Sequence, residues 1–471
     1  MGTLSIAAAE SLLFELSAAE FVFARAFKKL MKKTRHNAVP AQPAAPIEVR
    51  AEKLVYGPDA LAHYDSRAVF VPFLLPGELA RVRPIEQKKK FIRARVEQIL
   101  EPSPERIAAP CPHFGVCGGC NYQHLGYPAQ LRAKGDILRE TLSRIGHVRW
   151  EGPIQTRSFP QFYYRNRAQW KIRRLDGRAR IGYFQAGSQT LCPVGACPIL
   201  SPLLERTLQR IGELLGAGNA LAGVDEIEAF ADGEDRRLLL NCSVAQLPRD
   251  AGLAETLRGA VPEIESLLFV ELSEGKMSLD GPGHLSYAVG QHTYRVGHLS
   301  FFQVNRYALD AAVSLVCGDR RGKLALDLYA GVGLFSVPLA RQFERVIAVE
   351  SNPAAARDLE FNLHASGGAS PTARLSTAEV FLERWRDAVD FVTLDPPRAG
   401  VAEPALRQLR KFGPREIVYL SCDPATLARD LAILAAQDDG VSRFDIRDVY
   451  LIDIFPQTYH MEALVRLERR A

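Results

Sequence analysis

From about residue 300 onward, short apolar runs alternate with helical sequence, and this alternation restricts the fold more than any other feature of the chain. We expect strands at residues 323–328, 345–350, 390–395 and 416–420, with helical sequence between them. Such alternation is typical of an α/β fold with a doubly wound parallel sheet. Two further strands, at 445–454 and 462–467, are joined by a connection too short to cross over the sheet. The final strand should therefore run antiparallel to its neighbour.

The length of 471 residues exceeds one ordinary domain, so we expect several. Four parts are predicted: an N-terminal extension with a Pro/Ala linker (1–46), a small β-barrel (47–101), a central α+β domain (102–298) and the α/β domain (299–471). Short strands with Gly and Pro turns favour the barrel. The central part combines helical sequence at 128–145 and 203–215 with alternating strands at 160–185 and 225–290.

Composition sets broad limits on the function. Hydrophobic residues make up 47% and charged residues 24%, as in globular proteins. The net charge of +5 permits a polyanionic partner without demonstrating one. The longest apolar stretch, residues 4–27, is interrupted by three glutamates and lacks the features of a signal peptide. We expect a cytoplasmic monomer that does not bind a membrane.

A cofactor site is predicted where the parallel strands end. The first strand runs into D-L-Y-A-G-V-G, residues 327–333, whose glycines let the backbone approach a nucleotide-like ligand. Ser336 stands where a third glycine would complete the dinucleotide fingerprint, which disfavours a nicotinamide enzyme. Asp327, Glu350 and Asp395 stand at three strand ends, the edge at which such sheets bind ligands. Together these features favour S-adenosylmethionine.

A thiol and a carboxylate are expected at the same edge. Cys422 follows the strand at 416–420 and precedes Asp-Pro, which indicates a turn, although a lone cysteine is usually buried and inert. The final strand should open with His460 and Glu462 on one face. Because that strand starts where the others end, Glu462 should meet Cys422. Alone, Glu462 would pass for an ordinary exposed acid.

A thiol, a carboxylate and a methyl donor together suit methylation of carbon 5 of uracil. A thiolate adds to carbon 6, carbon 5 then attacks the methyl group, a base removes the carbon-5 proton, and elimination frees the thiol. Arg398 is a candidate electrostatic aid.

From about residue 47 to its C-terminus, the chain resembles the bacterial RNA uracil-C5 methyltransferases, which include the 5-methyluridine enzymes of ribosomal RNA and tRNA. The resemblance rests on F-F-Q-V-N at 301–305, the 327–333 turn, D-P-P-R at 395–398, S-C-x-P and H-x-E. It departs at Ala330, where the family has Cys, and at Asp423, where it has Asn. Neither change removes a reacting group, although Asp423 would be able to alter the pKa of Cys422.

The resemblance implies a class I (Rossmann-like) methyltransferase domain and assigns roles within it. Cys422 would be the nucleophile and Glu462 the proton acceptor. The expected cofactor contacts are Gln303, Tyr329, Glu350 and Asp395.

Three cysteines, Cys111, Cys117 and Cys120, lie within ten residues and would be able to wrap one metal centre. Spacing alone leaves zinc and iron–sulfur open, and the fourth ligand open between Cys192 and Cys197. The resembled family holds a [4Fe–4S] cluster with C-x5-C-x2-C and a distant Cys-Pro, which implies Cys111, Cys117, Cys120 and Cys197 as ligands. Its role would be structural or in RNA contact, since the methylation has no redox step.

Residues 47–101 further resemble the TRAM domain, an OB-like barrel that grips single-stranded RNA through basic and aromatic groups. Residues 163–174 form a second basic–aromatic segment, for which we favour an RNA contact over the alternative of a solvated strand. A uridine in folded RNA would have to be flipped out to reach Cys422. We expect 23S ribosomal RNA rather than tRNA as substrate.

Three other functions remain in view. An RNA cytosine-C5 methyltransferase would carry Pro-Cys on the fourth strand, where this chain has D-P-P-R. An exocyclic-amine methyltransferase would need no thiol. A non-catalytic RNA-binding iron–sulfur protein with a relic methyltransferase fold would not bind S-adenosylmethionine.

Overall fold

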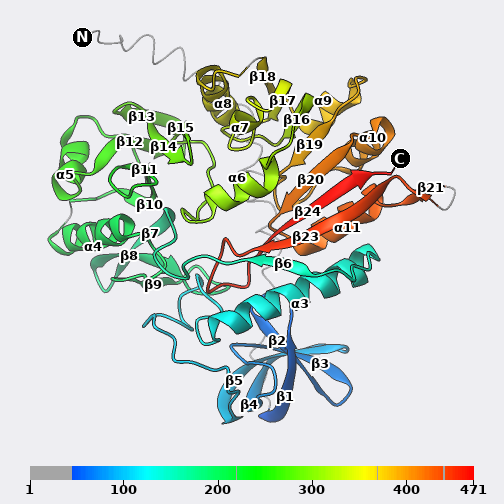
Figure 1. Cartoon of the computed structure of the whole chain (residues 1–471). Helices are drawn as coiled ribbons and strands as arrows, with labels where there is room; N and C mark the ends of the chain where they lie inside the picture. Colours follow the sequence, from blue (N-terminus) through cyan, green and yellow to red (C-terminus); the bar gives the residue numbers. More distant parts are fainter. Residues whose placement is uncertain (1–44, 219, 369, 439–440, 471) are drawn as a thin grey trace.

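A computed structural model describes residues 45–218, 220–368, 370–438 and 441–470. The predicted N-terminal extension, residues 1–46, lies almost wholly outside these ranges. A barrel, a central α+β part and a large α/β part succeed one another along the chain (Figure 1). A long helix, α3 (Tyr127–Gly146), runs between the barrel and the α/β part (Figure 1). Pro128 in its first turn and the left-handed His147 at its C-cap fix its two ends.

The first described part is a closed barrel with the strand order β1-β2-β3-β5-β4, as predicted for residues 47–101. Its strands are β1 (Ile47–Leu54), β2 (Asp59–Tyr64), β3 (Arg67–Pro72), β4 (Leu79–Gln87) and β5 (Phe91–Glu101). Alternate residues such as Val49, Val69 and Val82 are fully buried inside it. The barrel is anchored on α3 by an ion pair between Lys53 Nζ and the Glu140 carboxylate at 2.7 Å.

The central part is built on a seven-stranded sheet of the order β13-β12-β11-β10-β7-β8-β9. Its strands are β7 (Arg167–Leu175), β8 (Arg178–Phe184), β9 (Leu191–Pro193), β10 (Val224–Ala231), β11 (Leu238–Val244), β12 (Ile264–Glu271) and β13 (Lys276–Asp280). Two helices, α4 (Pro202–Gly216) and α5 (Gly252–Ala260), accompany it, and the hairpin β14 (His284–Val289) and β15 (His292–Gly297) follows. The helix predicted at 203–215 is confirmed by α4.

The α/β part holds an eight-stranded sheet of the order β18-β17-β16-β19-β20-β24-β23-β6. Its strands are β16 (Gly322–Leu328), β17 (Phe343–Glu350), β18 (Pro371–Leu375), β19 (Phe391–Leu394), β20 (Glu416–Ser421), β23 (Phe444–Ile452), β24 (Glu462–Arg469) and β6 (Ile154–Arg157). The accompanying helices are α6 (Leu309–Cys317), α7 (Ser336–Leu339), α8 (Pro353–Ala365), α9 (Ala378–Glu383), α10 (Glu403–Phe412) and α11 (Pro424–Leu434), and a small hairpin joins β21 (Gln437–Asp438) to β22 (Val441–Ser442).

The pairing confirms the predicted topology and extends it. Strands β16, β17, β19 and β20 are mutually parallel, and β24 runs antiparallel to β20. The edge strand β6 was not predicted. Its residues, 154–157, fall within the predicted central domain, but they pair in parallel with β23 in the sheet of the α/β part. Four residues of mixed polarity are too few to show the alternation that predicts a strand.

One close approach ties α3 to α11, the helix that follows β20. A Cβ on Gly146 would lie 2.4 Å from the carbonyl oxygen of Ala428 in α11, so only glycine permits the observed packing of the two helices. The carboxyl ends of the parallel strands, the start of β24 and α3 therefore meet in one region. No helix in the described ranges has the length and apolar character needed to cross a membrane.

Candidate active site

The turn after β16 is shaped to receive a ligand. Tyr329, Gly331 and Gly333 all have positive φ angles, of 67°, 57° and 93°. The φ of Gly333 lies in the region that favours glycine, and the nearest atom to a Cβ at this position would be the end of the Leu359 side chain. The backbone N–H of Gly331 donates to Glu350 Oε2 at 2.8 Å, which joins the turn to the end of β17.

Acidic side chains gather beside this turn. Asp327 is fully buried and accepts a hydrogen bond from the Ser336 hydroxyl, so the serine that interrupts the glycine fingerprint has a partner of its own. Burial, with smaller contributions from Asp395 and Glu350, raises the pKa of Asp327 to about 7. Its other oxygen has no hydrogen-bond partner among the described residues. A buried, unpartnered carboxylate oxygen is well suited to a ligand that brings a donor or a positive charge.

The structure brings two of the four expected cofactor contacts into direct contact. Gln303 Nε2 donates to Asp395 Oδ2 at 3.3 Å, and burial raises the pKa of Asp395 to about 6. The hydroxyl of Tyr329 lies 3.3 Å from Glu379 Oε1, a partner that the sequence did not indicate. Glu350 accepts a hydrogen bond from the backbone N–H of Gly331, which lies two residues after Tyr329 in the same turn.

The thiol of Cys422 lies at the end of β20, half-buried, as the sequence predicted. Burial and the Glu462 carboxylate raise its pKa to about 11, while the Arg398 guanidinium acts in the opposite direction. The neighbouring Asp423 caps α11, accepting from the N–H groups of Ala425 and Thr426 at 3.0 and 2.9 Å. The carboxylate of Asp423 is therefore committed to a helix N-terminus, and the largest influences on Cys422 come from elsewhere.

Glu462 is the first residue of β24 and is buried, so the interpretation as an exposed acid is wrong. Burial and the nearby Asp395 raise its pKa well above the ordinary value for glutamate. Its Oε1 atom has no hydrogen-bond partner among the described residues. His460 was expected in the same strand but lies in the preceding loop, since β24 begins only at Glu462. Burial, Arg398 and Lys134 lower the pKa of His460 to about 4, so its ring is neutral near pH 7.

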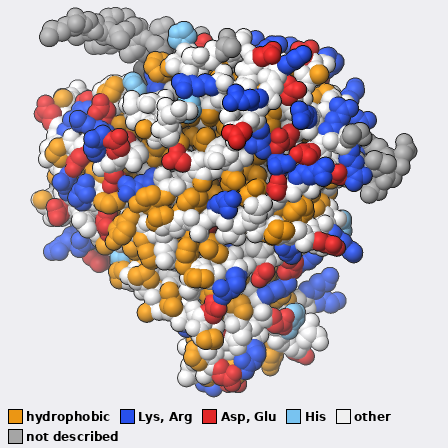
Figure 2. Space-filling view, viewed as in Figure 1, with side chains coloured by type: hydrophobic (Ala, Val, Ile, Leu, Met, Phe, Trp, Pro, Cys, Tyr) orange, Lys and Arg blue, Asp and Glu red, His pale blue; other side chains and the backbone are white. Residues whose placement is uncertain are grey.

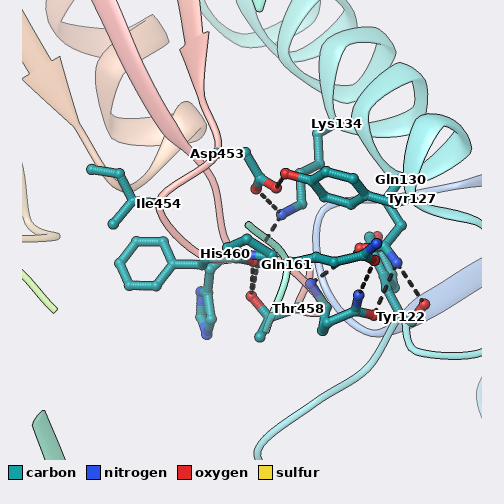
Figure 3. Close-up of polar contacts among 12 residues, drawn as sticks. Tyr122, Tyr127, Gln130, Lys134, Gln161, Asp453, Ile454, Thr458 and His460 are labelled. Atoms are coloured by element: carbon teal, nitrogen blue, oxygen red, sulfur yellow. Dashed lines mark hydrogen bonds and ion pairs between the residues drawn. The ribbon is translucent and has the colours of Figure 1, made fainter. Parts of the chain in front are cut away.

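The loop between β23 and β24, residues 453–461, leads directly into Glu462 and is held by α3 (Figure 3). Lys134 Nζ lies 2.6 Å from Asp453 Oδ1, and both side chains are fully buried. The hydroxyl of Tyr127 donates to the other Asp453 oxygen at 2.8 Å. Gln130 and Gln457 are joined by two hydrogen bonds of 3.0 and 3.1 Å. Gln457 has a positive φ of 68°, and these bonds hold it in that conformation. No sequence pattern links positions more than 300 residues apart, so this group was not predicted.

The four expected cluster ligands line one cavity of about 250 Å³, which we call the cysteine cavity: Cys111, Cys117, Cys120 and Cys197. Arg398 and His460 lie on its wall too, so it adjoins the region of the expected reacting residues. The Gly119 N–H donates to Cys117 Sγ at 3.4 Å. Within the described ranges, no three His, Cys, Asp or Glu side chains are arranged to hold a metal ion.

The second basic–aromatic segment is only partly available to a partner. Tyr163 is exposed and has a positive φ of 56°, whereas Tyr164 is buried and donates to the Pro456 carbonyl at 3.1 Å. Arg167 and Lys171 form ion pairs with Glu228 and Glu226.

On the face shown in Figure 2, hydrophobic side chains gather across the middle and charged side chains lie mostly around the periphery.

Comparison with known proteins adds independent findings. Residues 284–470 match the family model described as tRNA (Uracil-5-)-methyltransferase. A relative from Aquifex aeolicus, described as an uncharacterized RNA methyltransferase, is 34% identical over 434 residues, covering 90% of this chain and 98% of the relative. The 23S rRNA (uracil(1939)-C(5))-methyltransferase RlmD of Alkalilimnicola ehrlichii is 32% identical, covering 91% and 98% of the two chains.

Among solved structures, the chain is similar to the tRNA (uracil-54, C5)-methyltransferase of Pyrococcus abyssi in complex with S-adenosyl-L-homocysteine. The TM-score is 0.69 at 22% identity, with 89% of this chain and all of the other covered. This likeness establishes the fold.

Proposed function

Because the chain belongs to the family of S-adenosylmethionine-dependent RNA uracil-C5 methyltransferases, we propose that it methylates carbon 5 of one uridine in 23S ribosomal RNA. The observation that carries the proposal is the thiol of Cys422 beside the buried carboxylate of Glu462, at the sheet edge where the acids of the cofactor site gather. An exocyclic-amine enzyme would leave this pair without a use, and a cytosine-C5 enzyme is disfavoured because the fourth parallel strand runs into D-P-P-R, residues 395–398, without a cysteine.

The residues act in a fixed order in this proposal. The thiolate of Cys422 forms a bond to carbon 6 of the uracil, and Arg398 stabilises its negative charge. Bound S-adenosylmethionine would supply the methyl group: carbon 5 would form a bond to the methyl carbon as the bond from that carbon to the sulfonium sulfur breaks, which leaves S-adenosylhomocysteine. Glu462 then takes the carbon-5 proton, and its raised pKa suits a proton acceptor. Breaking the bond between Cys422 and carbon 6 restores the double bond and frees the product.

For the cofactor, we propose contacts with Gln303, Tyr329, Glu350 and Asp395. The positive-φ turn and the buried acids fit a ligand with ribose hydroxyls and a sulfonium charge. Glu350 accepts two backbone N–H groups, from Gly331 and Asn352, at 2.8 and 2.6 Å. A carboxylate has about four acceptor positions, so it retains capacity for ribose hydroxyls.

For the cysteine cavity, we propose a [4Fe–4S] cluster on Cys111, Cys117, Cys120 and Cys197. Four thiols that share one mainly apolar cavity, with an N–H group donating to one sulfur, fit such a cluster. A single zinc ion bound by four thiolates is the alternative occupant of this cavity, and metal analysis separates the two.

Metal analysis of two variants tests this assignment. After anaerobic purification, we expect about four irons and four sulfides per chain, lost in Cys197→Ser and retained in the matched control Cys192→Ser. Stoichiometric zinc, or loss of iron in Cys192→Ser alone, would overturn it.

The substrate class rests on the extent of similarity. The likeness to the RlmD enzyme spans 91% of the chain and so includes the barrel and the cysteine region, which the family model does not cover. We propose that the barrel is a TRAM-like RNA-binding domain and that the predicted division at 102 and 299 holds except for β6, residues 154–157, which belongs to the sheet of the α/β part. An enzyme of bacterial ribosomal RNA would act in the cytoplasm, and we propose that it does so as a monomer.

Methyl transfer to unmodified transcripts tests the substrate. We expect labelled methyl groups in 23S rRNA, at one uridine, and none in a tRNA pool at equal concentration. Because the matching family model is described by a tRNA enzyme, tRNA is the second candidate. Labelling of tRNA alone would establish it and refute the ribosomal assignment.

A further inference from the structure

We infer that the barrel contributes a positioning residue to the catalytic site: Tyr56 fixes the backbone of Cys422. The hydroxyl of Tyr56 donates to the carbonyl oxygen of Cys422 at 3.2 Å, across 366 residues of sequence. The inference rests on the proposed role of Cys422 as the nucleophile.

The turn that carries Tyr56 is itself held in place. It joins β1 to β2, closes with a hydrogen bond from Val55 N to Asp59 O at 3.2 Å, and contains Gly57 at a φ of 128°. The Tyr122 hydroxyl lies 3.5 Å from the Gly57 carbonyl oxygen. The ion pair from Lys53 to α3 is solvent-exposed and adds little, so the turn is held mainly by its own closing hydrogen bond and by the packing of Tyr56 on Tyr459.

The backbone of Cys422 lies between a strand and a helix, where neither element fixes it by its own hydrogen bonds. The ladder between β20 and β24 ends at the pair Ser421–Ala463, so Cys422 lies one residue beyond the last strand pair. On its other side, Asp423 begins the cap of α11. The hydrogen bond from Tyr56 therefore restrains the residue that carries the thiol, between two elements that each stop short of it.

The ring of Tyr56 reaches the other side of the site. It packs edge-on against Tyr459 with ring centroids 5.7 Å apart, and Tyr459 packs against His460 at 4.1 Å. Burial and the Asp423 carboxylate raise the pKa of Tyr56, so its hydroxyl remains a donor at every working pH. One barrel residue thus touches both the turn that bears Cys422 and the loop that leads into Glu462.

The test is Tyr56→Phe, which removes the hydroxyl and keeps the ring on Tyr459. Tyr122→Phe is the matched control, because it removes a hydroxyl that faces the same turn without touching Cys422. The readouts are the single-turnover rate of covalent adduct formation with RNA containing 5-fluorouridine, kcat and KM for RNA, and the thermal unfolding midpoint.

We expect Tyr56→Phe to slow adduct formation and kcat by roughly 2- to 12-fold, the equivalent of one net hydrogen bond, with KM within twofold of wild type. Tyr122→Phe should leave adduct formation within twofold. An unchanged adduct rate in Tyr56→Phe, a change in KM alone, or an equal loss in Tyr122→Phe would overturn the inference. If the wild-type protein itself forms no adduct, the proposed function fails instead, so the two failures are distinguishable.

Discussion

The ion pair between Lys134 and Asp453 offers the sharpest test of how α3 holds the loop of residues 453–461. Both side chains have no solvent exposure, and their charged atoms lie 2.6 Å apart. Lys134→Met retains most of the aliphatic volume but leaves the Asp453 carboxylate buried with only the Tyr127 hydroxyl as a polar partner. Lys134 also donates to the Phe455 carbonyl at 3.0 Å, so a second bond to the loop is lost.

The magnitude follows from the asymmetry of buried pairs. Removing one partner of a buried ion pair costs about 3–5 kcal/mol, whereas replacing both with apolar residues is often nearly neutral. Lys134→Met should therefore lower the unfolding free energy by about that amount, and the double variant Lys134→Met/Asp453→Leu should recover most of it. The pKa of Lys134 is lowered by burial, which marks the cost of keeping its charge inside.

Urea denaturation followed by tryptophan fluorescence gives the stability, and the rate at which tritium is released from carbon 5 of labelled RNA gives the function of the loop. We expect slower tritium release in Lys134→Met, because the same loop leads into Glu462. A loss of stability below about 1 kcal/mol in the single variant, or a double variant no better than the single, would refute the reasoning.

Two further predictions concern the titrating groups of the site. Arg398→Gln removes the cation that opposes the raised pKa of Cys422, so the pH profile of Cys422 alkylation by iodoacetamide should move to higher pH; an unmoved profile would show that Arg398 does not act on the thiol. Asp327 has a folded-state pKa of about 7 against 3.8 for the ordinary group. The folded protein therefore holds a proton that the unfolded chain has released, and the unfolding free energy should fall as pH rises from about 4 to 7, by at most ~1.4 kcal/mol per pH unit. In Asp327→Asn, which keeps an acceptor for Ser336, that slope should decrease; an equal slope in urea titrations of both proteins would contradict the assignment.

Much of the fold was predictable because it depends on local periodicity. The parallel strands, the antiparallel final strand and the barrel all follow from alternating apolar residues and turn residues. Strand β6 was missed because its four residues obtain their place from β23 rather than from their own pattern. The start of β24 at Glu462 agrees with the predicted strand 462–467, whereas the expectation that this strand already opens at His460 was wrong, since period two continues into the loop.

The site was predictable as a set of reacting groups and not as an environment. Residue types at strand ends pointed to Cys422, Glu462 and the acids, since the fold alone brings strand ends together. The contacts of Tyr56 with Cys422 and of Lys134 with Asp453 were not predictable, because each joins residues more than 300 positions apart in the sequence. Asp423 shows the same limit: as a sequence feature it is a charge next to a thiol, but in the structure it is a helix cap.

The central claim is that Cys422 attacks carbon 6 of a uracil in RNA. The most direct measurement is peptide mass spectrometry of the denaturation-stable complex formed with S-adenosylmethionine and RNA containing 5-fluorouridine, in which fluorine replaces the proton that Glu462 would remove. We predict a methylated fluorouridine attached to Cys422, and no complex with Cys422→Ala. Methylation of RNA by Cys422→Ala, or a complex attached to any other residue, would contradict the account.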